Sequence, residues 1–146
     1  MNAPGPINSL DEAHRRATAD GNQWRGRLIN LYARAEGRIS DALHRVEPDR
    51  TLPLLLSQKI SRLKKLSTDP LLIEELAKLE GRLGERNSLV HGEGKIWIDP
   101  NGEWLLQLSQ RRRAGDVQHM LQSDTVKSCH AELHKLVQRL ASKLKA

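Results

Sequence analysis

The chain has 146 residues, which is enough for one domain of ordinary size with a buried core. Apolar residues make up 38% and aromatic residues 3%, with no Phe, so the core must consist of Leu, Ile, Val and Ala, which suits packed helices. The single cysteine excludes a disulfide framework, and no apolar run is long enough to cross a membrane. The first residues lack the features of a signal peptide. We therefore expect a cytoplasmic protein without a membrane partner.

We expect residues 1–8 to be an unstructured tail. Ser9 and Glu12 have the spacing of a capping box and predict a helix start, and Gly21-Asn22 is expected to loosen or break that helix. From residue 24 to 46, apolar residues recur at steps of three and four and predict one buried helical face, which ends before Pro48. The face comprises Trp24, Leu28, Leu31, Tyr32, Ala35, Ile39, Ala42, Leu43 and Val46.

Two more helices are expected over residues 53–66 and 70–90. Thr51 would cap the first, with Pro53 in its first turn, and Asp69-Pro70 is a cap followed by a first-turn proline for the second. Gly81 and Gly84 lie inside the second helix and weaken it. The inward residues are expected to be Leu56, Ile60, Leu63 and Leu66, then Leu72, Leu76, Leu79, Leu83 and Val90.

The periodicity then changes to that of strands. Residues 95–98 and 103–108 flank Asp99-Pro100-Asn101-Gly102, which predicts a type I turn with Gly in the left-handed position. In this hairpin, Trp97 and Trp104 are expected to lie opposite each other on the two strands, or nearly so. A turn at 114–116 leads to a third strand over 117–121, and a last helix begins near Ser123 with Cys129 on its apolar face.

The predicted fold is therefore mainly α. It is an antiparallel bundle of about four helices, with a β-hairpin or small three-stranded meander inserted at about 95–121 before the last helix. Residues 9–146 would form one domain.

The net charge of +6 is concentrated near the C-terminus. Residues 101–146 carry eight basic and four acidic groups, and the densest cluster is Arg111, Arg112 and Arg113. A basic surface attracts phosphate backbones, but it also serves simply to keep a protein soluble. The charge permits nucleic-acid binding without demonstrating it.

The segment with the clearest chemical content is Arg86-Asn87-Ser88-Leu89-Val90-His91. Asn87 and His91 are four residues apart and share one face of a helix, whereas Arg86 converges with His91 only if the helix ends or bends there. A guanidinium, an amide and an imidazole together suit a phosphate site with proton transfer. The structural alternative is that Arg86 pairs with an acidic neighbour while Asn87 and His91 cap the helix end.

Arg86, Asn87 and His91, at the end of a helix in a small helical chain, resemble the motif of the HEPN superfamily (higher eukaryotes and prokaryotes nucleotide-binding). The resemblance implies a metal-independent endoribonuclease that needs no cofactor and leaves 2′,3′-cyclic phosphate ends. His91 would be the general acid/base, Arg86 would stabilise the charged phosphorane, and Asn87 would hold one of them in place. One branch has a Tyr two positions after the His; here that residue is Glu93.

The resemblance also implies partners. HEPN domains often pair as homodimers that bring two motifs together, and many act on RNA as toxins or in antiviral defence beside an antitoxin or defence partner. The alternatives are a catalytically inactive module of the same fold that binds RNA or a protein, and a purely structural oligomerisation protein.

Other residues have two interpretations each. Trp97 either packs in the hairpin or stacks on RNA bases, and Arg111, Arg112 and Arg113 are either a solvated strand end or an RNA-binding site. His130 and His134 have metal-ligand spacing, but Ala131 stands where a metalloprotease has Glu, so we expect no metal.

Overall fold

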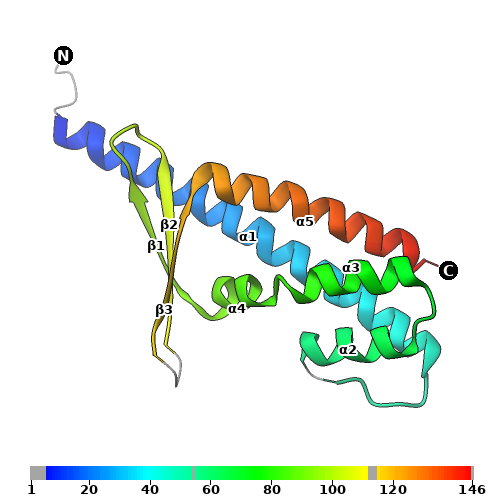
Figure 1. Ribbon diagram of the computed structural model, residues 1–146. Helices are drawn as coiled ribbons and strands as arrows, with labels where there is room; N and C mark the ends of the chain where they lie inside the picture. The colour runs from blue at the N-terminus through cyan, green and yellow to red at the C-terminus, as the bar shows by residue number, and fades with distance from the viewer. Residues whose placement is uncertain (1–5, 54, 112–114, 146) are drawn as a thin grey trace. The chain divides into compact units, whose positions relative to one another are not determined.

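The computed structural model describes residues 6–53, 55–111 and 115–145, and they form a mainly helical protein with one small antiparallel sheet before the last helix (Figure 1). This confirms the predicted fold class. In chain order the elements are α1 (Pro6–Val46), α2 (Leu56–Leu66), α3 (Pro70–Glu80), α4 (Leu83–His91), β1 (Glu93–Ile98), β2 (Trp104–Gln110), β3 (Val117–Gln122) and α5 (Ser123–Lys143).

The first helix is longer than the sequence predicts. It begins at Pro6, since proline fits the first turn of a helix, so part of the expected tail is helical and the predicted start at Ser9 is wrong. It also continues through Gly21, where the sequence predicts a break. Gly21 is buried, and a Cβ there would lie 2.6 Å from Cδ1 of Ile96, so the glycine serves close packing against the sheet. The predicted apolar face is largely buried, but Val46 is exposed.

The second and third predicted helices need corrections. α2 begins at Leu56, not near Thr51 or Pro53, and the Gln58 side chain accepts the Leu55 N–H at 3.5 Å. Asp69 caps α3 as predicted, accepting the Leu71 N–H at 2.9 Å.

The predicted helix over 70–90 is two helices, because the chain turns at Gly81–Arg82, where glycine's low helix propensity favours a stop. Because of this turn, the buried face of α4 does not follow from continuing the helical periodicity of α3. Leu89 is fully buried, whereas Val90, predicted to face inward, is 39% exposed. Leu66 of α2 is also predicted to face inward and is partly exposed.

The sheet is a meander in the order β1-β2-β3. The predicted turn is confirmed: Gly102 has φ +81°, and the Asp99 carboxylate accepts the N–H groups of Asn101 and Glu103, both at 2.9 Å. Trp97 pairs with Leu105, and Ile98 pairs with Trp104. The two tryptophans therefore point to opposite faces of the sheet, and Trp104 is buried while Trp97 is exposed.

The described residues group into two compact units, Met1–Leu28 with Ser88–His130 and Ile29–Asn87 with Ala131–Ala146. Helices α1, α4 and α5 each contribute residues to both. The core is aliphatic, as predicted, apart from Trp104 in the first unit and Tyr32 in the second. Cys129, expected in the core, is half-buried. No helix in the described part of the chain is long and apolar enough to cross a membrane.

Candidate functional site

All three motif residues lie on α4. Arg86 and Asn87 belong to the second unit and His91 to the first, and His91 is the last residue of the helix. The predicted placement of the motif at a helix end is confirmed. The four-residue spacing of Asn87 and His91 is therefore a helical one.

Arg86 and Asn87 are half-buried and joined by a hydrogen bond from Nη1 of Arg86 to Oδ1 of Asn87, at 3.1 Å. Together with Leu83 they line a pocket of about 110 Å³, whose other wall is the start of α2, formed by Leu55, Leu56 and Ser57. N–H groups in the first turn of a helix lack intrahelical partners. This pocket thus presents a guanidinium, a hydroxyl group and a helix start, which is a set of groups suited to a small anion.

The start of α4 is fixed within the second unit. The buried Tyr32 hydroxyl, on α1, donates to Oε1 of Glu85 at 3.0 Å and lies 3.3 Å from the carbonyl oxygen of Arg82. Arg82 in turn donates to Glu132 of α5 at 2.7 Å. Burial alone would lower the pKa of Arg82, but the hydrogen bond to Glu132 and the charge of Glu85 outweigh it and raise that pKa above its ordinary value.

The end of α4 is fixed within the first unit by Arg25 of α1. Its Nε and Nη2 donate to the carbonyl oxygen of Leu89 at 3.1 and 2.7 Å, and Nη2 also donates to that of Gly92 at 2.8 Å. Gly94 leaves room for this guanidinium, because a Cβ there would lie 2.1 Å from Nη1 of Arg25. His91 is exposed, and in the sequence it lies between Leu89 and Gly92, whose carbonyl oxygens Arg25 binds.

Arg25 is a residue that sequence reasoning misses. Its acceptors lie 64 and 67 residues away along the chain, and a single arginine in an amphipathic helix carries no local signal. The three hydrogen bonds that Arg25 donates to described residues all go to backbone carbonyl oxygens, so Arg25 fixes the backbone on either side of His91.

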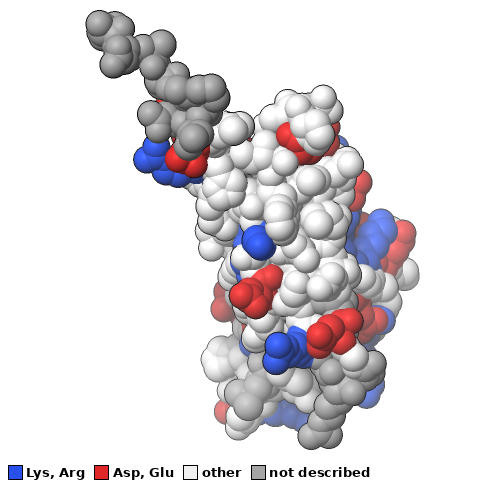
Figure 2. All heavy atoms as spheres, turned by 90° about the vertical axis from the view of Figure 1, so that its left-hand side faces the viewer, with Lys and Arg blue, Asp and Glu red and all other residues white. Residues whose placement is uncertain are grey.

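The predicted RNA-binding residues lie on or after the sheet. Trp97 is 44% exposed; its indole N–H donates to Oε1 of Gln107 at 2.8 Å, and the Lys95 ammonium lies 4.2 Å from its ring centroid. Arg111 follows β2 and is exposed, whereas Arg112 and Arg113 lie outside the described residues. On the side of the molecule drawn in Figure 2, charged residues are scattered among uncharged ones.

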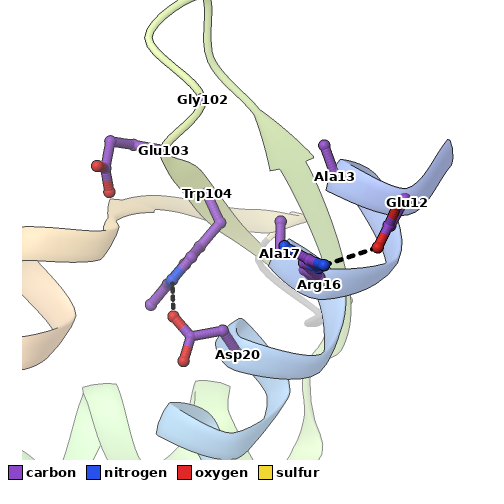
Figure 3. A pocket seen from close by; sticks show the side chains of 8 residues that line it. All are labelled: Glu12, Ala13, Arg16, Ala17, Asp20, Gly102, Glu103 and Trp104. Atoms are coloured by element: carbon purple, nitrogen blue, oxygen red, sulfur yellow. Dashed lines mark hydrogen bonds and ion pairs between the residues drawn. The ribbon is translucent and has the colours of Figure 1, made fainter. Parts of the chain in front are cut away.

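A larger pocket, with a volume of about 510 Å³, lies between α1 and the start of β2 (Figure 3). It carries three carboxylates and one guanidinium. Asp20 accepts the indole N–H of Trp104 at 2.7 Å, and Arg16 pairs with Glu12 at 2.7 Å (Figure 3). Glu103 accepts from Ser123 at 3.1 Å. An excess of negative charge makes this pocket a poor site for RNA.

His130 and His134 do not lie in a cluster of potential metal ligands. Within the described residues, no group of three or more His, Cys, Asp and Glu side chains converges. The His130 ring instead packs edge-on against Trp24, with centroids 5.2 Å apart.

No model of a protein family, no curated protein and no solved structure matches the chain.

Proposed function

We propose that the protein is a metal-independent endoribonuclease of the HEPN type, with RNA as substrate and Arg86, Asn87 and His91 as its site. We further propose that it works as a homodimer, as the family resemblance implies. The observation that carries the proposal is the Arg86–Asn87 pair at an anion-sized pocket, on the same helix that ends in the exposed His91.

In the proposed reaction, the His91 imidazole removes the proton from a ribose 2′-hydroxyl. The 2′-oxygen then attacks the adjacent phosphorus, the bond to the 5′-oxygen breaks, and this oxygen takes up a proton. The products are a 2′,3′-cyclic phosphate and a 5′-hydroxyl. No water, metal ion or external cofactor is consumed in this step.

Arg86 would stabilise the extra negative charge on the phosphorane, since a guanidinium can donate two parallel hydrogen bonds to phosphate oxygens. Asn87 would orient Arg86 through the hydrogen bond between their side chains. Removing one such charge-stabilising donor typically costs about 100- to 1,000-fold in rate.

The test is cleavage of a mixed RNA pool in EDTA by the wild type, His91→Ala and His44→Ala. His44 is a matched control, because it is also an exposed histidine in the last turn of a helix. The proposal expects cyclic-phosphate ends from the wild type and His44→Ala, and none from His91→Ala. Equal cleavage by His91→Ala would reject it.

Intact RNA in all three samples would also reject catalysis. It would favour the alternative of an inactive module that binds RNA or a protein partner. Measuring RNA binding on the same samples would then distinguish a module that binds RNA from one that binds a protein.

A further inference from the structure

The sheet of the first unit has one buried and one open face. Along β2, the buried side chains alternate with half-buried ones, as is common for antiparallel sheets, and in β1 the buried Ile96 stands between the exposed Lys95 and Trp97. The side chains on the buried face include Ile96, Trp104, Leu106 and Leu108.

The strand register defines the open face as three rows of three residues. The rows are Glu93–Ser109–Gln118, Lys95–Gln107–Met120 and Trp97–Leu105–Gln122. Neighbouring strands are about 4.8 Å apart, and same-face neighbours along a strand about 6.6 Å apart, so the nine side chains form one continuous surface. We call these nine residues the outer sheet face.

Trp97 is the largest side chain on the outer sheet face, and its position is defined by two neighbours. Gln107 accepts its indole N–H, and Lys95 lies over its ring. The ring is held in place yet remains 44% exposed, and Met120 on the next row is 56% exposed. A fixed, exposed indole is a surface on which another flat ring can stack.

The polar groups around Trp97 match nucleotides. Gln107, Gln118 and Gln122 carry amides that can both donate to and accept from base edges. Lys95 adds a positive charge beside the ring, whereas Glu93 and Arg111 both lie toward the other end of the sheet, where Glu93 pairs with Ser109. Past Trp97, the carboxylates of Asp99 and Glu103 accept hydrogen bonds from the turn's N–H groups and from Ser123. On the outer sheet face, the charge beside Trp97 is therefore the Lys95 ammonium, which can attract a phosphate.

We propose that the outer sheet face binds single-stranded RNA, with a base stacked on Trp97, the glutamine amides at base edges and Lys95 near the backbone. The inference rests on the proposed function in taking RNA as the ligand. The inference adds the path of the RNA to the proposed function. Because β1 begins two residues after His91, an RNA strand that runs along β1 from Trp97 approaches the histidine.

The geometry favours single strands over duplexes, because bases in a duplex already stack on each other and leave no free face for Trp97. It also favours RNA over a second copy of the chain. Exposed Trp and Met occur in protein interfaces too, but the nine residues contain three glutamines and a lysine, whereas Lys is depleted in interface cores.

The experiment measures binding of the full chain to a fluorescein-labelled 2′-O-methyl oligoribonucleotide by fluorescence anisotropy in EDTA. Without a 2′-hydroxyl this probe cannot be cleaved, so binding is measured whether or not the catalytic proposal holds. The variants are Trp97→Ala, Trp97→Phe and Lys95→Gln, with Lys65→Gln as the control. Lys65 is an exposed lysine on α2, so both lysine variants lose the same net charge.

We expect Trp97→Ala to weaken binding by about 5- to 150-fold, the effect of losing one stacked base, while Trp97→Phe retains most of the affinity. Lys95→Gln should weaken binding and reduce its salt dependence more than Lys65→Gln does. A duplex of the same sequence should compete poorly.

Three results would overturn the inference. One is the absence of wild-type binding to the probe; another is equal affinity of Trp97→Ala. The third is a wild-type dimer that Trp97→Ala converts to a monomer without changing RNA affinity, which would make this face a protein interface. Circular dichroism of each variant checks its folding. Should Trp97→Ala fail to fold, the comparison of Lys95→Gln with Lys65→Gln still tests the inference, because equal affinities of these two variants would contradict it.

Discussion

The guanidinium of Arg25 holds the carbonyl oxygen of Leu89 with two nitrogens, at 3.1 and 2.7 Å. Carbonyl groups in the last turn of a helix have no intrahelical donor, and here a side chain from another helix supplies one. A further bond from the same guanidinium reaches Gly92 at 2.8 Å. The backbone is therefore anchored on both sides of His91.

Replacement of Arg25 by Met should lower the free energy of unfolding by about 1–3 kcal/mol, because partly buried carbonyls lose a charged donor. The measurement is urea unfolding. Arg27→Met is the control, since Arg27 is exposed on the same helix and lies over the Trp24 ring. If the protein cleaves RNA, Arg25→Met should reduce kcat more than it raises KM, and Arg25→Lys should not restore the rate, because lysine lacks the planar fork. Equal stability of Arg25→Met and wild type would contradict this role.

Gly94→Ala should imitate the loss of Arg25. A Cβ at Gly94 would lie 2.1 Å from Nη1 of Arg25, so the guanidinium must leave its acceptors. In a double-mutant cycle, Gly94→Ala should destabilise the wild type and have much less effect in Arg25→Met. Strictly additive effects would show that the two positions do not interact.

Gly21→Ala should destabilise the protein by about 1–3 kcal/mol through overpacking, even though alanine is the better helix former. The added Cβ would meet Ile96 at 2.6 Å and Trp104 at 3.4 Å. Gly37 lies on the same helix, and a Cβ added there would have no neighbouring atom within 4 Å, so Gly37→Ala should raise stability by up to about 1 kcal/mol. Thermal unfolding of the two variants should therefore shift in opposite directions, and shifts of the same sign would refute the packing argument.

Ser88→Ala should stabilise the protein. The Ser88 side chain is buried, and among the described residues its hydroxyl has no hydrogen-bond partner. Removing an unsatisfied buried hydroxyl relieves a desolvation penalty of about 1–3 kcal/mol, less the small loss of packing. Urea unfolding measures the change, with Ser61→Ala as an exposed helical control. A loss of stability in Ser88→Ala would mean that the hydroxyl is solvated or bonded in solution.

Local signals predict most of the fold. The Asp99–Gly102 turn and the Asp69 cap each depend on residues within a few positions, and the structure confirms both. Two of the errors concern glycines, because the sequence alone does not show whether a glycine inside a helix is a packing position or a stop. Gly21 continues its helix because the sheet packs against it, whereas Gly81 ends its helix.

The candidate site is predictable only in part. The spacing of Asn87 and His91 places the motif at a helix end, which the structure confirms. The pocket beside Arg86 depends on the start of α2, which lies about 30 residues earlier and for which the sequence predicts the wrong residue. The contact of Arg25 with Leu89 also spans too many residues to leave a sequence pattern.

The meander order of the sheet has a consequence for how the protein folds. Each strand pairs only with its neighbour along the chain, so the connecting loops that must close are short and cost little entropy. Such local pairing is typical of rapid folding, and residues 93–122 hold every strand of the sheet. Forming the backbone ladder of the sheet therefore requires no hydrogen-bonding partner from outside residues 93–122.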